Sequence, residues 1–128
     1  MPTWLETGEI LYFYSELLVE HGGLAGPPDL GAVKSTLARP KNLLAHEPES
    51  SIYQLGACYG YGFAKKHCFS DGNKRVALVC IDVFLLGNGH ELEAEETEAV
   101  SVIRSVAASE MTEEELSAWV ELRAVPVK

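Results

Sequence analysis

The most constraining feature of this sequence is an eleven-residue apolar run, from Val76 to Leu86, that only Asp82 interrupts. Such a run is too short to cross a bilayer, which takes about 20 apolar residues. A helix that is apolar on nearly all sides is instead buried. We therefore predict a helix over residues 73–86 at the centre of a helical bundle, with Asp82 hydrogen-bonded or exposed at its rim rather than functional.

Apolar positions at helical spacing predict further helices around this one. One of them contains Gly56, Gly60 and Gly62, which weaken it by about 1 kcal/mol each and are interpreted as small residues that let another helix approach closely. No segment is a convincing strand. We predict a single all-α domain over residues 1–128, a bundle of about six helices. The other helices are expected over Thr7–His21, over Leu30–Arg39 and from residue 49 or 50 to 66. A fifth is expected to open with the glutamates of Glu93–Glu98, and the last to start at a capping box, Thr112–Glu115.

The second of these helices is expected to end at Pro40, because proline disfavours helical geometry at the residue before it. Residues 40–48 then form a loop with an apolar middle that contains Leu43 and Leu44. Two interpretations stay open. The loop could pair with an extended peptide by strand addition, or the two leucines could pack on the core.

The functional signal is the segment that leads into the apolar helix, His67-Cys68-Phe69-Ser70-Asp71-Gly72-Asn73-Lys74-Arg75. The first amides of a helix lack internal partners and carry partial positive charge, so such a junction can bind an anion. Gly72 permits the turn because glycine tolerates positive φ. The backbone amides of Gly72, Asn73 and Lys74 are therefore candidate phosphate ligands. Lys74 and Arg75 add formal charge beside them.

The other side chains of the segment also have roles in this interpretation. Asp71 suits an anion site if a cation lies between the two, and we predict Mg²⁺ there. Asn73 either orients a phosphate or fixes the loop. His67 is the natural proton acceptor, because histidine has an ordinary pKa of about 6.5, near neutrality. Phe69 is interpreted as an apolar anchor that holds the loop rigid.

The charge of the chain limits its partners. Ten Lys and Arg against nineteen Asp and Glu give a formal net charge of −9, which disfavours binding of nucleic acid by a broad basic surface. The acidity either serves solubility or attracts a basic partner. Lys65, Lys66, Lys74 and Arg75 form a local basic cluster, whose size suits a nucleotide rather than a duplex.

The cysteines and the first residues favour a cytoplasmic protein. Cys58, Cys68 and Cys80 show no metal or redox spacing, and an odd number argues against a disulfide framework. Residues 1–6 lack the basic region and apolar core of a signal peptide. We therefore expect reduced thiols in a cytoplasm.

The nine-residue segment resembles the signature of the Fic/Doc family, which reads roughly His-x-Phe-x-Asp/Glu-Gly-Asn-x-Arg. Its ending resembles the Doc (death on curing) branch. The Fic adenylyl-transferase branch has glycine where this chain has Lys74, and a second arginine where this chain has Leu78. The resemblance runs from about Gly22 to Gly89. It places Cys68 at a variable position, which argues against a nucleophilic role for that thiol.

The resemblance implies an all-α domain and a Doc-type toxin that uses ATP and Mg²⁺ to phosphorylate a hydroxyl of translation elongation factor Tu, which blocks translation. It assigns catalysis to His67, Lys74 and Arg75, and makes residues 40–48 a flap that positions the target. It also implies a small antitoxin whose C-terminal segment becomes helical in a groove on the toxin. The alternatives are a Fic-type adenylyl transferase and a catalytically silent binding module. A metal-dependent phosphoesterase is disfavoured, because one carboxylate and one histidine are few ligands.

Overall fold

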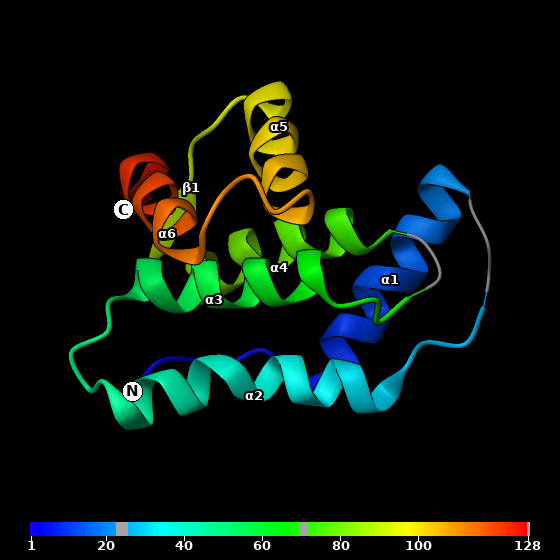
Figure 1. Cartoon of the computed structure of the whole chain (residues 1–128), viewed down its shortest axis with the longest axis horizontal. Helices are drawn as coiled ribbons and strands as arrows, with labels where there is room; N and C mark the ends of the chain where they lie inside the picture. The colour runs from blue at the N-terminus through cyan, green and yellow to red at the C-terminus, as the bar shows by residue number, and fades with distance from the viewer. Residues whose placement is uncertain (23–25, 70–71, 128) are drawn as a thin grey trace.

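The computed structural model describes residues 1–22, 26–69 and 72–127 (Figure 1). Within these residues the chain forms six α-helices and two three-residue strands, which confirms the predicted all-α class. The helices are α1 (Thr7–His21), α2 (Leu30–His46), α3 (Ile52–Lys65), α4 (Asn73–Gly87), α5 (Glu96–Ala107) and α6 (Glu113–Arg123), and the strands are β1 (His90–Leu92) and β2 (Ala124–Pro126).

Two helices share the centre of the bundle. α3 packs against α2, α4, α5 and α6, while α4 packs against α1, α3, α5 and β1. Figure 1 shows α3 between α2 on one side and α5 and α6 on the other. The large, fully buried side chains include Tyr59 and Phe63 of α3 and Ile81 and Phe84 of α4. The apolar helix therefore shares its predicted central place with the helix that precedes it.

Glycines in α3 let the neighbouring helices approach closely, as the sequence suggested. A Cβ atom added at Gly60 would lie 2.4 Å from Cδ1 of Ile81 in α4. One added at Gly62 would lie 2.7 Å from Cγ2 of Thr36 in α2. A larger residue at either position would force the facing side chain or its helix to move.

We expect Gly62→Ala to destabilise the fold, although alanine favours helix. Thr36 is fully buried and, as a β-branched residue, is stiff at χ1. Overpacking therefore costs about 1–3 kcal/mol, against a gain in helix propensity of about 1 kcal/mol. Chemical denaturation should show a net loss. Gly8→Ala in α1 is the control, because nothing lies within 4 Å of its added Cβ, and it should be neutral or stabilising. A Gly62→Ala variant as stable as the Gly8→Ala variant would contradict the packing argument.

α2 does not end at Pro40, so that prediction was wrong. The helix continues to His46 with Pro40 buried inside it. An internal proline costs about 3 kcal/mol, but Leu43 and Leu44 beyond it pack against the core, and this burial offsets the cost. Packing of the two leucines is therefore confirmed. Strand addition by residues 40–46, and a loop-like flap there, are excluded because this backbone is helical.

The absence of strands was also predicted wrongly. β1 pairs with β2 in an antiparallel two-stranded sheet. Next to it, the Glu93 amide donates to the Arg123 carbonyl at 2.7 Å, so the segment that follows α4 is joined to the end of α6. Strands this short show no alternation of apolar and polar residues, and the sequence pattern could not reveal them.

A capping box and the carboxyl of Asp82 have the local roles that the sequence predicted. The Thr112 hydroxyl accepts a hydrogen bond from the Glu115 amide at 3.1 Å, and the Glu115 carboxylate accepts one from the Thr112 amide at 2.9 Å, which confirms the capping box. Asp82 is half-buried, and burial raises the pKa of its carboxyl, while a hydrogen bond from the Leu92 backbone opposes that shift. Asp82 thus links α4 to β1.

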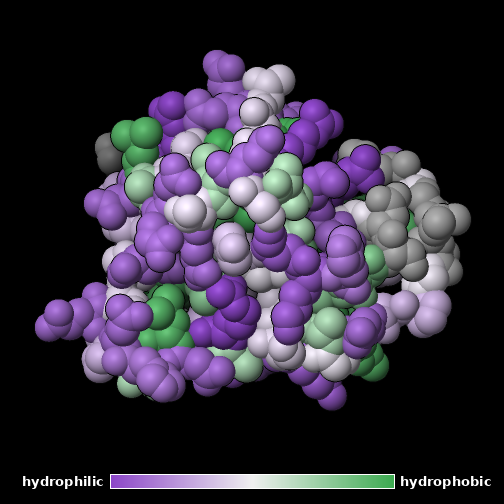
Figure 2. Space-filling view, viewed as in Figure 1, coloured by the Kyte–Doolittle hydropathy of each residue, from purple (hydrophilic) through white to green (hydrophobic). Residues whose placement is uncertain are grey.

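Polar residues cover most of the face shown in Figure 2, and the apolar patches on it are small. The large apolar side chains that are exposed among the described residues lie on several elements; they include Tyr12, Val19, Leu30, Leu86 and Leu122. No helix in the described part of the chain is long and apolar enough to cross a membrane.

Candidate functional site

The junction of α3 and α4 opens onto a cavity of about 670 Å³. This volume lies within the usual range of small-molecule sites, about 300–1,000 Å³. Three helices supply the walls: the end of α3, the start of α4, and one side of α5. The lining residues are Ala64, Lys65, His67, Gly72, Asn73, Lys74, Arg75, Leu78, Glu96, Val100, Ile103, Arg104 and Ala107.

The three residues predicted to be catalytic line this one cavity. His67 lies two positions beyond the end of α3 and is exposed, so its imidazole is not turned into the hydrophobic interior. Lys74 and Arg75, in the first turn of α4, are also exposed. The arrangement places a proton acceptor beside two cations and the amide end of a helix. Their catalytic roles stay predictions.

Gly72 is the N-cap of α4 and has a φ of +84°, in the left-handed region that glycine tolerates. Its carbonyl accepts the first bond of the helix, from the Val76 amide at 2.9 Å. The positive end of the α4 dipole therefore meets the cavity that Gly72 and Asn73 line. A Cβ atom at Gly72 would strain this turn.

The side chain of Asn73 closes the loop onto itself. Its Oδ1 accepts a hydrogen bond from the Phe69 amide at 3.1 Å, and its Nδ2 donates to the Phe69 carbonyl at 2.9 Å. Of the two roles foreseen for this side chain, the structure shows that of fixing the loop. A phosphate contact from Asn73 stays a prediction.

Two further contacts hold the loop from outside. The Asp29 amide, at the start of α2, donates to the Cys68 carbonyl at 2.7 Å. The Phe69 ring is buried and stacks on Tyr14 of α1, with ring centroids 4.2 Å apart and an interplanar angle of 18°. The loop thus rests on α1, α2 and the start of α4 at once. This burial supports the proposed anchor role of Phe69.

The thiol of Cys68 does not line the cavity. It is buried and lies 3.8 Å from the Thr36 hydroxyl. Burial raises the pKa of this thiol, while the Thr36 hydroxyl opposes the shift, so the reactive thiolate is disfavoured at neutral pH. Cys58 and Cys80 are also buried, and all three cysteines are free. The structure thus gives no support to a nucleophilic cysteine.

Asp71, the predicted Mg²⁺ ligand, lies outside the described residues. Among the residues that are described, no group of three or more His, Cys, Asp or Glu side chains could hold a metal ion. The only carboxylate that the described residues contribute to the cavity is that of Glu96. The metal role of Asp71 therefore stays a prediction.

Only part of the predicted basic cluster lines the cavity in the structure. Lys66 turns to α2, where its Nζ donates to the Ser35 hydroxyl at 2.6 Å, and it does not line the cavity. Lys65 does line the cavity, and its Nζ donates to the Ser109 hydroxyl just after α5. Arg104 of α5 also lines the cavity, although the sequence did not identify it as a site residue. The periodicity of α5 predicted an inward apolar face, but only its packing shows which residues reach the site.

Comparison with known proteins finds similarity over a little under two thirds of the chain. A model of the Fic/DOC family matches residues 4–85, a segment that runs from before α1 almost to the end of α4. The chain is 31% identical over 81 residues to a protein of Escherichia phage P1 named protein kinase doc. That match covers 63% of this chain and 64% of the phage protein, slightly less than two thirds of its length.

Proposed function

Because this chain belongs to the Fic/DOC family, we propose that it is a Doc-type toxin that transfers the γ-phosphate of ATP to a serine or threonine hydroxyl of a protein. The observation that carries the proposal is the shared cavity, in which an exposed His67 lies with Lys74 and Arg75 at the N-terminus of α4. The phage relative is named a protein kinase. The target proposed by resemblance is translation elongation factor Tu, which would place the activity in the cytoplasm.

The proposed reaction needs positioning and neutralisation of charge more than covalent chemistry from the protein. His67 accepts the proton of the incoming hydroxyl, whose oxygen bonds to the γ-phosphorus while the bond to the β,γ-bridging oxygen breaks and ADP leaves. Lys74, Arg75 and the amide end of α4 hold and neutralise the phosphates. Mg²⁺ bound through Asp71 would supply further neutralising charge.

Lys74 favours phosphoryl transfer over AMP transfer. It is exposed in the first turn of α4 and lines the cavity, so a γ-phosphate placed near the helix terminus would meet its charge. Leu78, one turn further along α4, adds an apolar group to the same wall. The adenylyl-transferase branch has glycine and arginine at these two positions, so both differences support phosphoryl transfer.

Incubation with elongation factor Tu and radiolabelled ATP distinguishes the two reactions. We expect label in the factor from γ-labelled ATP and none from α-labelled ATP, and loss of the signal when EDTA removes Mg²⁺. A gain of one phosphate should appear in the intact mass of the factor. Label from α-labelled ATP would replace the kinase proposal by AMP transfer. No label from either nucleotide would exclude this factor as the substrate.

The proposal includes a small antitoxin as a protein partner. The net charge of −9 is compatible with a basic segment in that partner. Induction of this chain alone should arrest growth of the host. Co-expression of a small protein encoded directly upstream should relieve the arrest and copurify with the chain.

A further inference from the structure

One wall of the cavity comes from α5, which lies beyond the segment that the family model matches. That match ends at residue 85, and α5 begins at Glu96. Val100, Ile103 and Ala107 give this wall an apolar surface. Arg104 gives it a cation. The residues of α5 therefore complete a site whose other half is the loop and the start of α4.

Arg104 differs from the two arginines that hold the fold together. Arg39 pairs with Glu113, and Arg123 pairs with Glu98. Arg104 is exposed, and no hydrogen bond or ion pair joins its side chain to another residue of the described chain. Its guanidinium thus keeps all its donors for a ligand.

The described lining of the cavity carries net positive charge in a strongly negative molecule. Its lining includes Lys65, Lys74, Arg75 and Arg104 against the single described carboxylate of Glu96, whereas the whole chain carries −9. Lys65 is already engaged by the Ser109 hydroxyl. Arg104 is therefore the described cation outside α4 that can face an anion bound at the α4 terminus. Leu78 offers no charge from the adjacent turn of α4.

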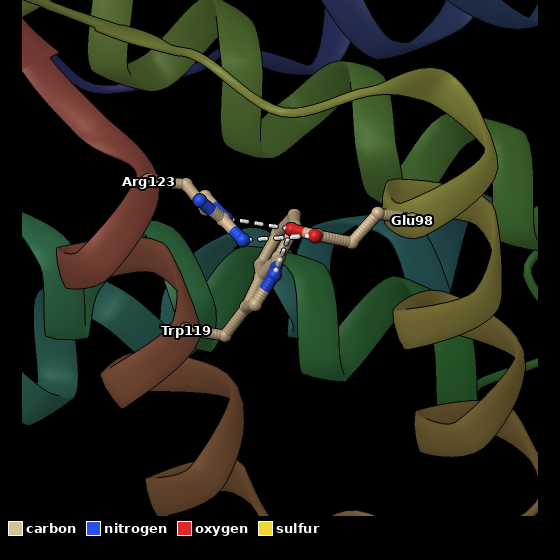
Figure 3. Close-up of polar contacts among 3 residues, drawn as sticks. All are labelled: Glu98, Trp119 and Arg123. Atoms are coloured by element: carbon tan, nitrogen blue, oxygen red, sulfur yellow. Dashed lines mark hydrogen bonds and ion pairs between the residues drawn. The ribbon is translucent and has the colours of Figure 1, made fainter.

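The α5 wall is held in place from its other end. Glu98, in the first turn of α5, accepts hydrogen bonds from Arg123 at 2.7 and 2.9 Å and from the Trp119 indole at 2.9 Å (Figure 3). These donors lower the pKa of the Glu98 carboxyl, so the carboxylate stays ionised further into acid than an ordinary glutamate. Lys65 and Ser109 tie the opposite end of α5 to α3. Arg104 therefore projects from a fixed support.

We propose that Arg104 binds the phosphate chain of the nucleotide from the α5 side, opposite Lys74 and Arg75. This inference rests on the proposed function, because it assumes that the cavity binds ATP. An arginine can contact two phosphate oxygens at once. A clamp between two helices would hold the polyphosphate in one direction and so expose the terminal phosphorus to His67.

The test is the affinity of the purified, full-length chain for ATP and for adenosine, measured by titration calorimetry. Arg104→Gln should weaken ATP binding about tenfold, the effect of one lost charge-assisted hydrogen bond, and leave adenosine binding unchanged. Arg104→Lys should recover part of the affinity. Lys34→Gln is the control, because Lys34 is exposed on α2 and does not line this cavity. Thermal unfolding should be the same for all variants.

The outcomes separate this inference from the proposal beneath it. If the wild-type chain binds no ATP, the proposed function itself is wrong and the inference loses its basis. If the wild type binds ATP and Arg104→Gln binds it within twofold of the wild type, the assignment of Arg104 is overturned while the proposed function stands. Equal loss of ATP and adenosine affinity would also overturn it, since that result indicates a contact with the nucleoside.

Discussion

The His67→Ala variant is expected to fold and to bind ATP as the wild-type chain does, yet to transfer phosphate about 10²- to 10⁴-fold more slowly. The fold should survive because His67 is exposed, lies outside the six helices, and makes no hydrogen bond, ion pair or ring contact with another described residue. Binding should survive because Lys74, Arg75 and the helix terminus keep the charge that holds phosphate. Only the proposed acceptor of the hydroxyl proton is removed.

The measurement is the initial rate of transfer to the protein substrate at saturating ATP, together with the ATP dissociation constant. His46→Ala is the matched control, because His46 is exposed at the end of α2 and lines no part of this cavity; its rate should equal that of the wild type. Cells that express His67→Ala should grow. Growth arrest as strong as with the wild type would favour a catalytically silent binding module.

The predictable part of the fold is the part that local chemistry determines. The apolar run that ends at Leu86 required burial, and α4 buries six of its residues between Val76 and Leu85. Thr112 and Glu115 form the capping box that their spacing indicates. Gly60 and Gly62 lie where α4 and α2 approach α3 closely. Each of these outcomes follows from residues within a few positions of one another.

The failures arose where distant residues decide the structure. Pro40 carries a local cost that ends most helices, but α2 continues because the core lies under its second half. β1 and β2 exist only because the segments that follow α4 and α6 meet. A propensity scale contains neither fact, since both come from tertiary packing.

The candidate site, too, could be predicted only in part from the sequence. The motif allowed His67, Lys74 and Arg75 to be grouped, and they line one cavity. The sequence did not show that the Asn73 side chain would hydrogen-bond to the Phe69 backbone, because the same amide group could equally well bind a phosphate. Arg104 could not be found at all, because nothing in its neighbourhood along the chain points to the loop.

The loop that carries His67 depends on Phe69, and Phe69→Ala should be the most destabilising single change in it. The ring is 3% exposed and packs on Tyr14 with centroids 4.2 Å apart. Loss of a buried Phe side chain costs about 3–5 kcal/mol, a large share of the roughly 5–15 kcal/mol that stabilises a domain. Urea denaturation should show this loss, and ATP affinity should fall with it because the loop loses its support.

Two further variants distinguish loss of the Phe69 anchor from a general loss of stability. Tyr12→Ala, on the same helix as Tyr14, removes an aromatic ring that is 61% exposed, and it should change stability by no more than about 0.5 kcal/mol. Phe69→Leu keeps most of the buried volume but loses the stacked pair, so it should cost about 1 kcal/mol and weaken ATP binding only slightly. Should Phe69→Leu abolish ATP binding at unchanged stability, Phe69 would contact the nucleotide, and its place as an anchor against α1 would be wrong.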